Sequence, residues 1–372
     1  MTGPFAEPPA DVDTSKPEYG EIHAVSRGMA TAVAPPGGLT NVQVSLLRAV
    51  TKAVTGVDID YRALEPLGPD DFAAVLARRG QGYKQRIVHH MVLAEMVLAP
   101  IPPDVAQRVA ACAEAFGIAD DFVAIARKYA KGALGQAAFD LRRNGFTAHV
   151  DPAFLTPLHS TAAPEDPWDE APAEPDLEAR WRHLADLTEG SLGRSVSDMY
   201  RARGFQLPGT RGAASATLAQ HDFVHVLADY GTTMEGELEV FAFVGRADPD
   251  PKGFAWLATM IGLFETGYVD RQGFFESNVR DRVLDNPGMD VRLADAIRRG
   301  KAVAENLGRD LFTVDYHSVA EHPVTLLADL LEIPAKSEEA LAAGSAGPFD
   351  PGGISEFQRA AGERAAQQPA AT

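Results

Sequence analysis

The sequence predicts an all-α protein with two helical domains, joined by an acidic Pro-rich linker, and with disordered termini. Apolar residues recur every three or four positions through two long blocks, residues 41–147 and 179–335, which is the spacing of amphipathic helices. Proline stands near several expected helix starts and glycine after expected helix ends, as is typical of helices. The chain has 372 residues, which accommodates two domains at roughly 150 residues each.

Residues 1–40 are rich in Pro, Gly and Ala without sustained periodicity, so we expect a flexible N-terminal arm. The first block is expected to be a small helical bundle. Its expected helices begin near Asn41 and Gly68 and continue at 83–98, 102–117, 119–130 and 133–144.

Residues 148–178 are expected to be a linker. The part from Pro164 to Glu178 holds seven acidic residues and four prolines in 15 positions, with no Lys or Arg. Such a run repels itself and cannot bury a core. The second block opens with a helix whose apolar stripe is Trp181, Leu184, Leu187 and Leu192. Residues 336–372 are rich in Ala, Gly, Pro and Gln and are expected to be a disordered tail.

Composition excludes several classes of protein. The net charge of −18 opposes binding to nucleic acid through bulk charge. The single cysteine, Cys112, rules out a disulfide within the chain and is expected to be a buried helix residue.

The longest uncharged apolar stretch, Gly253–Phe264, has 12 residues, whereas a membrane span needs about 20. With no secretory signal at the N-terminus, we expect a cytoplasmic protein, with at most peripheral contact at the inner face of a membrane.

The sharpest chemical signal is the run from His221 to His225, with Asp222 inside it and Glu237 after eleven further residues. If the run is helical, the two histidines lie on one face about one turn apart and can point at one cation. Asp222 lies about 100° further round the helix, where it would either bind a metal at the rim or orient a histidine.

Glu237 is expected on a returning helix that faces the histidine pair. Gly231 is placed to end the first helix, and Thr232 with Glu235 matches a capping box that would start the second. Glu239 is expected on a solvated face. Ten histidines in this chain give about 0.3 chance pairs at this spacing, so spacing alone leaves a metal site and surface histidines equally open.

The motif and its surroundings resemble the Coq-four family of ubiquinone (coenzyme Q) biosynthesis proteins over about residues 179–335. The likeness adds Gly236 before Glu237 and the segments Ser191–Phe205, Ile297–Gly300, Leu311–Tyr316 and Leu330–Pro334. Two departures stand out: Leu218-Ala219-Gln220 replaces the family's Arg-Tyr-Arg run, and Tyr316 replaces its Trp.

The resemblance implies a metal site made by His221, Asp222, His225 and Glu237, which are also its catalytic candidates. Imidazoles with carboxylates suit zinc first, with Fe, Mn or Mg as alternatives. It further implies an isoprenoid or prenylated quinone ligand, metal-dependent oxidative decarboxylation of a prenylated aromatic acid, and partner enzymes of quinone biosynthesis. A non-catalytic prenyl-lipid scaffold and a metal-dependent hydrolase remain as alternatives, and a homo-oligomer is compatible with the sequence.

Two further segments are candidates for contact with the ligand. Arg298 and Arg299, with Lys301, either bind a phosphate or carboxylate head group or form a solvated helix face. Phe254–Phe264 either lines an apolar tunnel for a prenyl tail or forms an ordinary buried helix.

Residues 41–147 resemble, more loosely, TerB-like helical domains, and the likeness is carried by Ala113–Asp121. The acidic turn of those domains is here Leu98–Asp104, which lacks the pattern of an acidic metal site. His89, His90 and Glu95 share one expected helix, and we interpret them as surface or interhelix polar residues.

Overall fold

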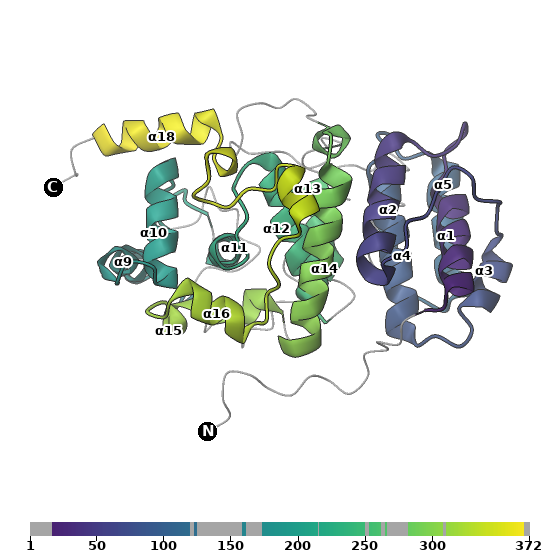
Figure 1. Cartoon of the computed structure of the whole chain (residues 1–372), viewed down its shortest axis with the longest axis horizontal. Helices are drawn as coiled ribbons and strands as arrows, with labels where there is room; N and C mark the ends of the chain where they lie inside the picture. Colours follow the sequence, from purple (N-terminus) through teal and green to yellow (C-terminus); the bar gives the residue numbers. More distant parts are fainter. Residues whose placement is uncertain are drawn as a thin grey trace, which may run out of the picture.

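The described part of the computed structural model is built from helices joined by turns and loops, which confirms the expected all-α class (Figure 1). It describes residues 17–119, 123–124, 158–160, 173–214, 216–249, 253–261, 265, 282–307 and 310–367. Within these ranges no strand forms, and the one isolated bridge joins Ser191 to Pro323. None of the helices described is long and apolar enough to cross a membrane.

The first block, residues 41–147, holds α2 to α5, and α1 precedes it in the chain and packs against it. Their bounds are α1 Tyr19–Val33, α2 Asn41–Thr55, α3 Pro69–Val75, α4 Gln81–Met96 and α5 Pro103–Ala115. Local sequence explains the helix ends. Thr40 and Gln43 form a capping box at the start of α2, and Gly56 ends it in the left-handed conformation at φ 77°. The expected helices at 119–130 and 133–144 lie almost wholly outside the described residues.

The second block begins earlier than expected, inside the predicted linker. Its helices are α9 Pro175–His183, α10 Leu192–Arg203, α11 Ala216–Leu227, α12 Met234–Ala247, α13 Phe254–Ile261, α14 Met289–Leu307, α15 Tyr316–Val319 and α16 Val324–Leu330, followed by α17 Glu338–Ala342 and α18 Glu356–Gln367. The stripe expected on a single helix is divided. Trp181 belongs to α9, Leu184 starts a short 3-10 turn, and Leu192 opens α10, which Ser191 caps.

The expected flexible arm at 1–40 is wrong for its second half, because α1 lies there. Ile22, Val25, Met29 and Val33 form its buried stripe. The helix packs against α3, α4 and α5. A Cβ at Gly28 would lie 2.3 Å from the ring of Phe72, so this glycine lets the aromatic ring approach the helix backbone. The Pro- and Gly-rich composition of the flanking segments hid this stripe.

The expected disordered tail at 336–372 is also wrong over most of its length. It contains α17 and α18, and α18 lies across the C-terminal end of α10 (Figure 1). The crossing is close, since a Cβ at Gly362 would lie 2.1 Å from the carbonyl oxygen of Ala202. Small residues here permit tight backbone packing, although the same composition is typical of disorder.

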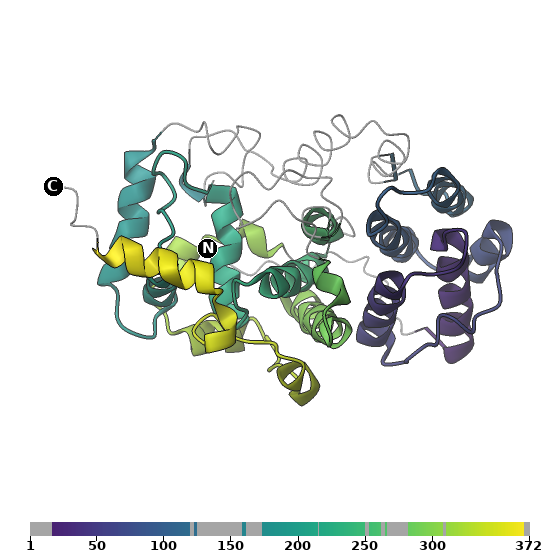
Figure 2. The same cartoon turned by 90° about the horizontal axis from the view of Figure 1, so that it is seen from above.

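The two blocks pack directly against each other. α14 lies between α12 and α2, and α13 contacts both α12 and α4 (Figure 2). The buried apolar residues of both blocks form one continuous cluster. A Cβ at Gly300 of α14 would lie 2.2 Å from the carbonyl oxygen of Phe243, so α14 also approaches α12 closely. The second block is therefore held on one side by the first.

Candidate metal centre

The two histidines lie on α11, as their spacing predicted, and Glu237 lies in the first turns of α12. The connecting turn is short and tight. Asp229 adopts a left-handed conformation at φ 59°, and the N–H of Tyr230 donates to the carbonyl oxygen of His225 at 2.9 Å. A Cβ at Gly236 would lie 2.0 Å from the carbonyl oxygen of Gly231. Glycine before Glu237 therefore lets α12 start close against the turn.

The predicted capping box does not form at this helix start. Thr233 caps α12 instead, and its hydroxyl accepts from the N–H of Gly236 at 3.3 Å. Glu235 accepts a hydrogen bond from the side chain of Asn286 at 2.8 Å. Thr232, one residue earlier, is buried and contacts α10 and the C-terminal segment.

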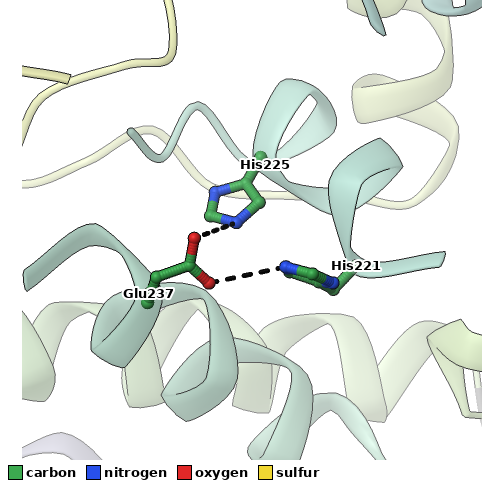
Figure 3. Close-up of side chains that lie close together, drawn as sticks. All are labelled: His221, His225 and Glu237. Carbon is green, nitrogen blue, oxygen red and sulfur yellow. Dashed lines mark ion pairs between the residues drawn. The ribbon is translucent and has the colours of Figure 1, made fainter. Parts of the chain in front are cut away.

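The Glu237 carboxylate lies between the two imidazole rings (Figure 3). Its Oε2 is 3.4 Å from Nε2 of His221, and its Oε1 is 3.4 Å from Nε2 of His225. The ligand atoms of these three residues all lie within 4.8 Å of one another. All three residues are buried, and His225 has no exposed surface. The fold therefore places the Nε2 atoms of two histidines and one carboxylate close enough together to bind a single ion.

Each imidazole is oriented by a backbone carbonyl. Nδ1 of His225 lies 3.1 Å from the carbonyl oxygen of Tyr230, and Nδ1 of His221 contacts that of Leu218. Because a carbonyl oxygen only accepts, Nδ1 carries the proton in both neutral rings. When a cation replaces any proton on Nε2, the lone pair of that atom, which faces Glu237, becomes available as a ligand. This arrangement is the one in which histidines commonly bind metals.

The electrostatics of the cluster favour a positive charge. Burial by itself would lower the pKa of His221, but Asp222 and Glu237 outweigh it and raise the pKa to about 9. Burial likewise opposes the ionised form of Glu237, but His225 and His221 together lower the pKa of its carboxyl. Within the part of the chain that the structure describes, Nε2 of His225 is buried without a hydrogen-bond partner, and Oε1 of Glu237 lies 3.4 Å away. A divalent cation would satisfy all three groups at once.

Asp222 lies beside this cluster rather than in it. Its Oδ2 accepts a hydrogen bond from the Tyr200 hydroxyl at 2.6 Å, and its Oδ1 is 3.6 Å from Nε2 of His221. Burial, with the charge of Asp222, raises the pKa of Tyr200 well above its usual value. The tyrosine therefore stays a donor and holds the carboxylate next to the candidate centre.

Among the described residues, no hydrogen bond or ion pair joins Arg298, Arg299 or Lys301 to His221 or His225. Arg298 pairs with Asp295 at 2.6 Å, and Lys301 pairs with Glu305. Arg299 is buried rather than solvated, and its guanidinium lies 4.8 Å from the ring centre of Tyr230. A head-group role for the two arginines stays a prediction.

Several other polar residues differ from expectation. Glu239 is buried, not solvated, because α14 covers this face of α12 and supplies Arg292 at 2.6 Å. His89, His90 and Glu95 are buried, so the interhelix interpretation holds and the surface one does not. The ring of His90 lies 5.1 Å from that of Phe254 on α13. Cys112 is buried as expected, and burial raises the pKa of its thiol to about 11.

Two residues that matter to the site carried no sequence signal. Arg203 is a fully buried arginine at the end of α10, and Tyr230 contributes its backbone oxygen.

Comparisons with protein-family models, with curated proteins and with solved structures found no match to this chain. The family resemblance therefore stays a prediction, and the site is argued from its geometry.

Proposed function

We propose that the chain binds one divalent metal ion through Nε2 of His221, Nε2 of His225 and the carboxylate of Glu237. The observation that carries this proposal is the convergence of these donors within 4.8 Å inside the protein, with both Nδ1 atoms held against carbonyl oxygens. Two imidazoles and a carboxylate suit zinc, with Fe(II) and Mn as alternatives, whereas Mg prefers oxygen ligands alone.

A metal held by three protein ligands retains open coordination positions for a substrate. Bound there, the ion would act as a Lewis acid and template for a substrate carboxylate. We propose, on the resemblance to the Coq-four family, that this substrate is a prenylated aromatic acid or quinone. Replacing its ring carboxyl by a hydroxyl releases CO2 and removes two electrons, so the reaction needs an oxidant such as dioxygen.

In this proposal the side chains around the ion have separate roles. His221, His225 and Glu237 hold the ion, and Asp222 lies close enough to His221 to keep the centre electrostatically balanced. The described side chains of α13 are buried between α12 and α4, which is the packing of a core helix. A tunnel for a prenyl tail along this segment stays a prediction.

Lipid extraction tests the ligand class. The full chain, purified from a host that makes isoprenoid quinones, is extracted with organic solvent and analysed by mass spectrometry. The proposal predicts a bound isoprenoid. Its absence would contradict the lipid ligand. Hydrolysis of a simple ester that is lost in Glu237→Ala would then favour a metal-dependent hydrolase.

Product formation separates enzyme from scaffold. His225→Ala should still retain the lipid but lose conversion of a prenylated aromatic acid. His183→Ala is the matched control, because His183 is largely exposed on α9, with a side chain 66% accessible. Unchanged conversion in His225→Ala would overturn the catalytic proposal and favour a lipid-binding scaffold.

A further inference from the structure

The segment from Lys336 to Gln367, here called the C-terminal strap, contacts the turn that separates the candidate ligands. That turn runs from Ala228 to Thr233, between α11 and α12. This turn contacts residues on both helices that carry the candidate ligands. It supplies the Tyr230 oxygen that orients His225, and it is in tight contact with Gly236, which precedes Glu237.

Backbone hydrogen bonds fix the strap to this turn. The N–H of Gly231 donates to the carbonyl oxygen of Ala346 at 2.8 Å, and the N–H of Thr232 donates to that of Gly353 at 2.8 Å. The side chain of Gln358 adds a third bond, from Nε2 to the carbonyl oxygen of Thr232 at 2.8 Å. Consecutive backbone groups of the turn are thus paired with the strap.

The contact is too close for larger residues. A Cβ at Gly231 would lie 2.4 Å from Cα of Gly353 and 2.7 Å from its carbonyl oxygen. Such spacing fixes one register between strap and turn. A shift of the strap would move the turn with it.

Arg203 joins three elements at this place. From the end of α10 its guanidinium donates to the hydroxyl of Thr232 in the turn. It also donates to two strap carbonyl oxygens, of Pro348 at 2.7 Å and of Gly353 at 3.0 Å. A planar guanidinium has five N–H donors, so it can make these bonds together, whereas a lysine ammonium has three.

We propose that Arg203 and the C-terminal strap are a positioning part of the metal centre, because together they fix the turn that sets His225 relative to Glu237. The inference rests on the proposed metal site. Among the described residues, no hydrogen bond or ion pair joins Arg203 or the strap to the coordinating atoms of His221, His225 or Glu237, so their action is exerted through the Tyr230 carbonyl and the start of α12. Groups that orient a metal-binding histidine typically contribute 10- to 100-fold in metal affinity.

Cobalt binding by the full chain tests this inference. Co²⁺ absorbs visible light according to its coordination geometry, so titration reports both affinity and the shape of the site. Arg203→Gln should weaken Co²⁺ affinity by about 10- to 100-fold and change the absorption bands. Gln358→Ala should act in the same direction by a smaller factor, and Arg203→Lys should restore part of the loss. Arg201→Gln, at an arginine of α10 whose side chain is 69% accessible and pairs with Asp198, is the matched control and should bind like wild type.

The outcomes separate this inference from the proposed function. If the wild-type protein binds no Co²⁺, or if the His225→Ala variant binds Co²⁺ as tightly as wild type does, the proposed metal site itself is wrong. If wild type binds at the site but Arg203→Gln and Gln358→Ala keep its affinity and spectrum, the positioning role alone is overturned. Should Arg203→Gln fail to fold by circular dichroism, Gln358→Ala and Arg203→Lys decide, because unchanged affinity and spectrum in both would overturn the role.

Discussion

Nδ1 of His225 donates to the backbone oxygen of Tyr230, five residues later, at 3.1 Å. The bond joins the His225 side chain, in the last turn of α11, to the backbone of the following turn. It determines that Nε2 is the ring nitrogen that faces Glu237. His221 is oriented in the same way by the Leu218 carbonyl. The site is therefore defined as much by backbone groups as by the three side chains that form it.

Replacing Glu237 by glutamine should weaken metal binding by more than the roughly 10- to 100-fold typical of a residue behind a ligand. Glutamine keeps the shape of the side chain but removes the negative charge between the two imidazoles. Chelator competition with Zn²⁺ measures the change. Glu235→Gln is the control on the same helix turn, since Glu235 contacts Asn286 instead. Equal affinities of the two variants would count against Glu237 as a ligand.

Tyr200→Phe should reduce the free energy of unfolding by about 1–3 kcal/mol, because it leaves the buried Asp222 carboxylate without its hydroxyl donor. Urea denaturation measures the difference. Tyr19→Phe makes the same chemical change at a residue that is 66% exposed and should have little effect. If both variants unfold at the same urea concentration as wild type, the Tyr200–Asp222 bond contributes no stability.

Acid should weaken the packing of α4 against α13 through His90. Burial, with the charges of Arg86, His89 and Arg246, lowers the pKa of His90 to about 3, from an ordinary 6.5. Between these values the unfolded chain binds more protons than the folded one, so stability falls as the pH drops below 6.5.

The His90 contribution is isolated by substitution. Lowering the pH from 6.5 to about 5 should reduce the free energy of unfolding of wild type by about 2 kcal/mol through His90. The His90→Leu variant should not show this loss. Urea midpoints at the two pH values measure this, and His183→Leu, at an exposed histidine, should behave like wild type. Parallel pH dependence of wild type and His90→Leu would show that His90 is not the responsible group.

The C-terminal strap should resist proteases despite its composition. The N–H groups of Gly231 and Thr232 are bonded to it, and α18 packs on α10. Limited proteolysis with mass spectrometry should leave residues 336–367 attached, and amide hydrogen exchange at Gly231 and Thr232 should be slow. Rapid cleavage between Gly344 and Ser355 in the native protein would contradict this arrangement.

The sequence predicted those parts of the site that depend on regular geometry. His221 and His225 share a helix face because their spacing matches one turn, and Glu237 follows after a connection short enough to return. The residues that orient the site were not predictable, since the carbonyls of Leu218 and Tyr230 carry no side-chain signal. Thr233 rather than Thr232 caps α12, a one-residue difference that local sequence does not resolve.

In the first block, α2 to α5 were predictable from apolar spacing and from Pro and Gly at their ends; in the second, α11 and α12 were predictable from the residues around the histidine pair. α1 and the strap were missed for a common reason: Gly and Ala mark disorder when they are exposed but close packing when they are buried. Gly28 under Phe72 and Gly362 against Ala202 are examples of the second case. Glu239 was misplaced because sequence does not show that α14 covers α12.

Metal content tests the central claim most directly. Wild type and a His221→Ala, His225→Ala double variant are purified in parallel without chelator, loaded with Zn²⁺, desalted and measured by plasma mass spectrometry. The geometry predicts about one equivalent of metal in wild type and a near-complete loss in the folded double variant. Equal metal content in the two proteins would contradict the assignment of His221, His225 and Glu237 as a metal site.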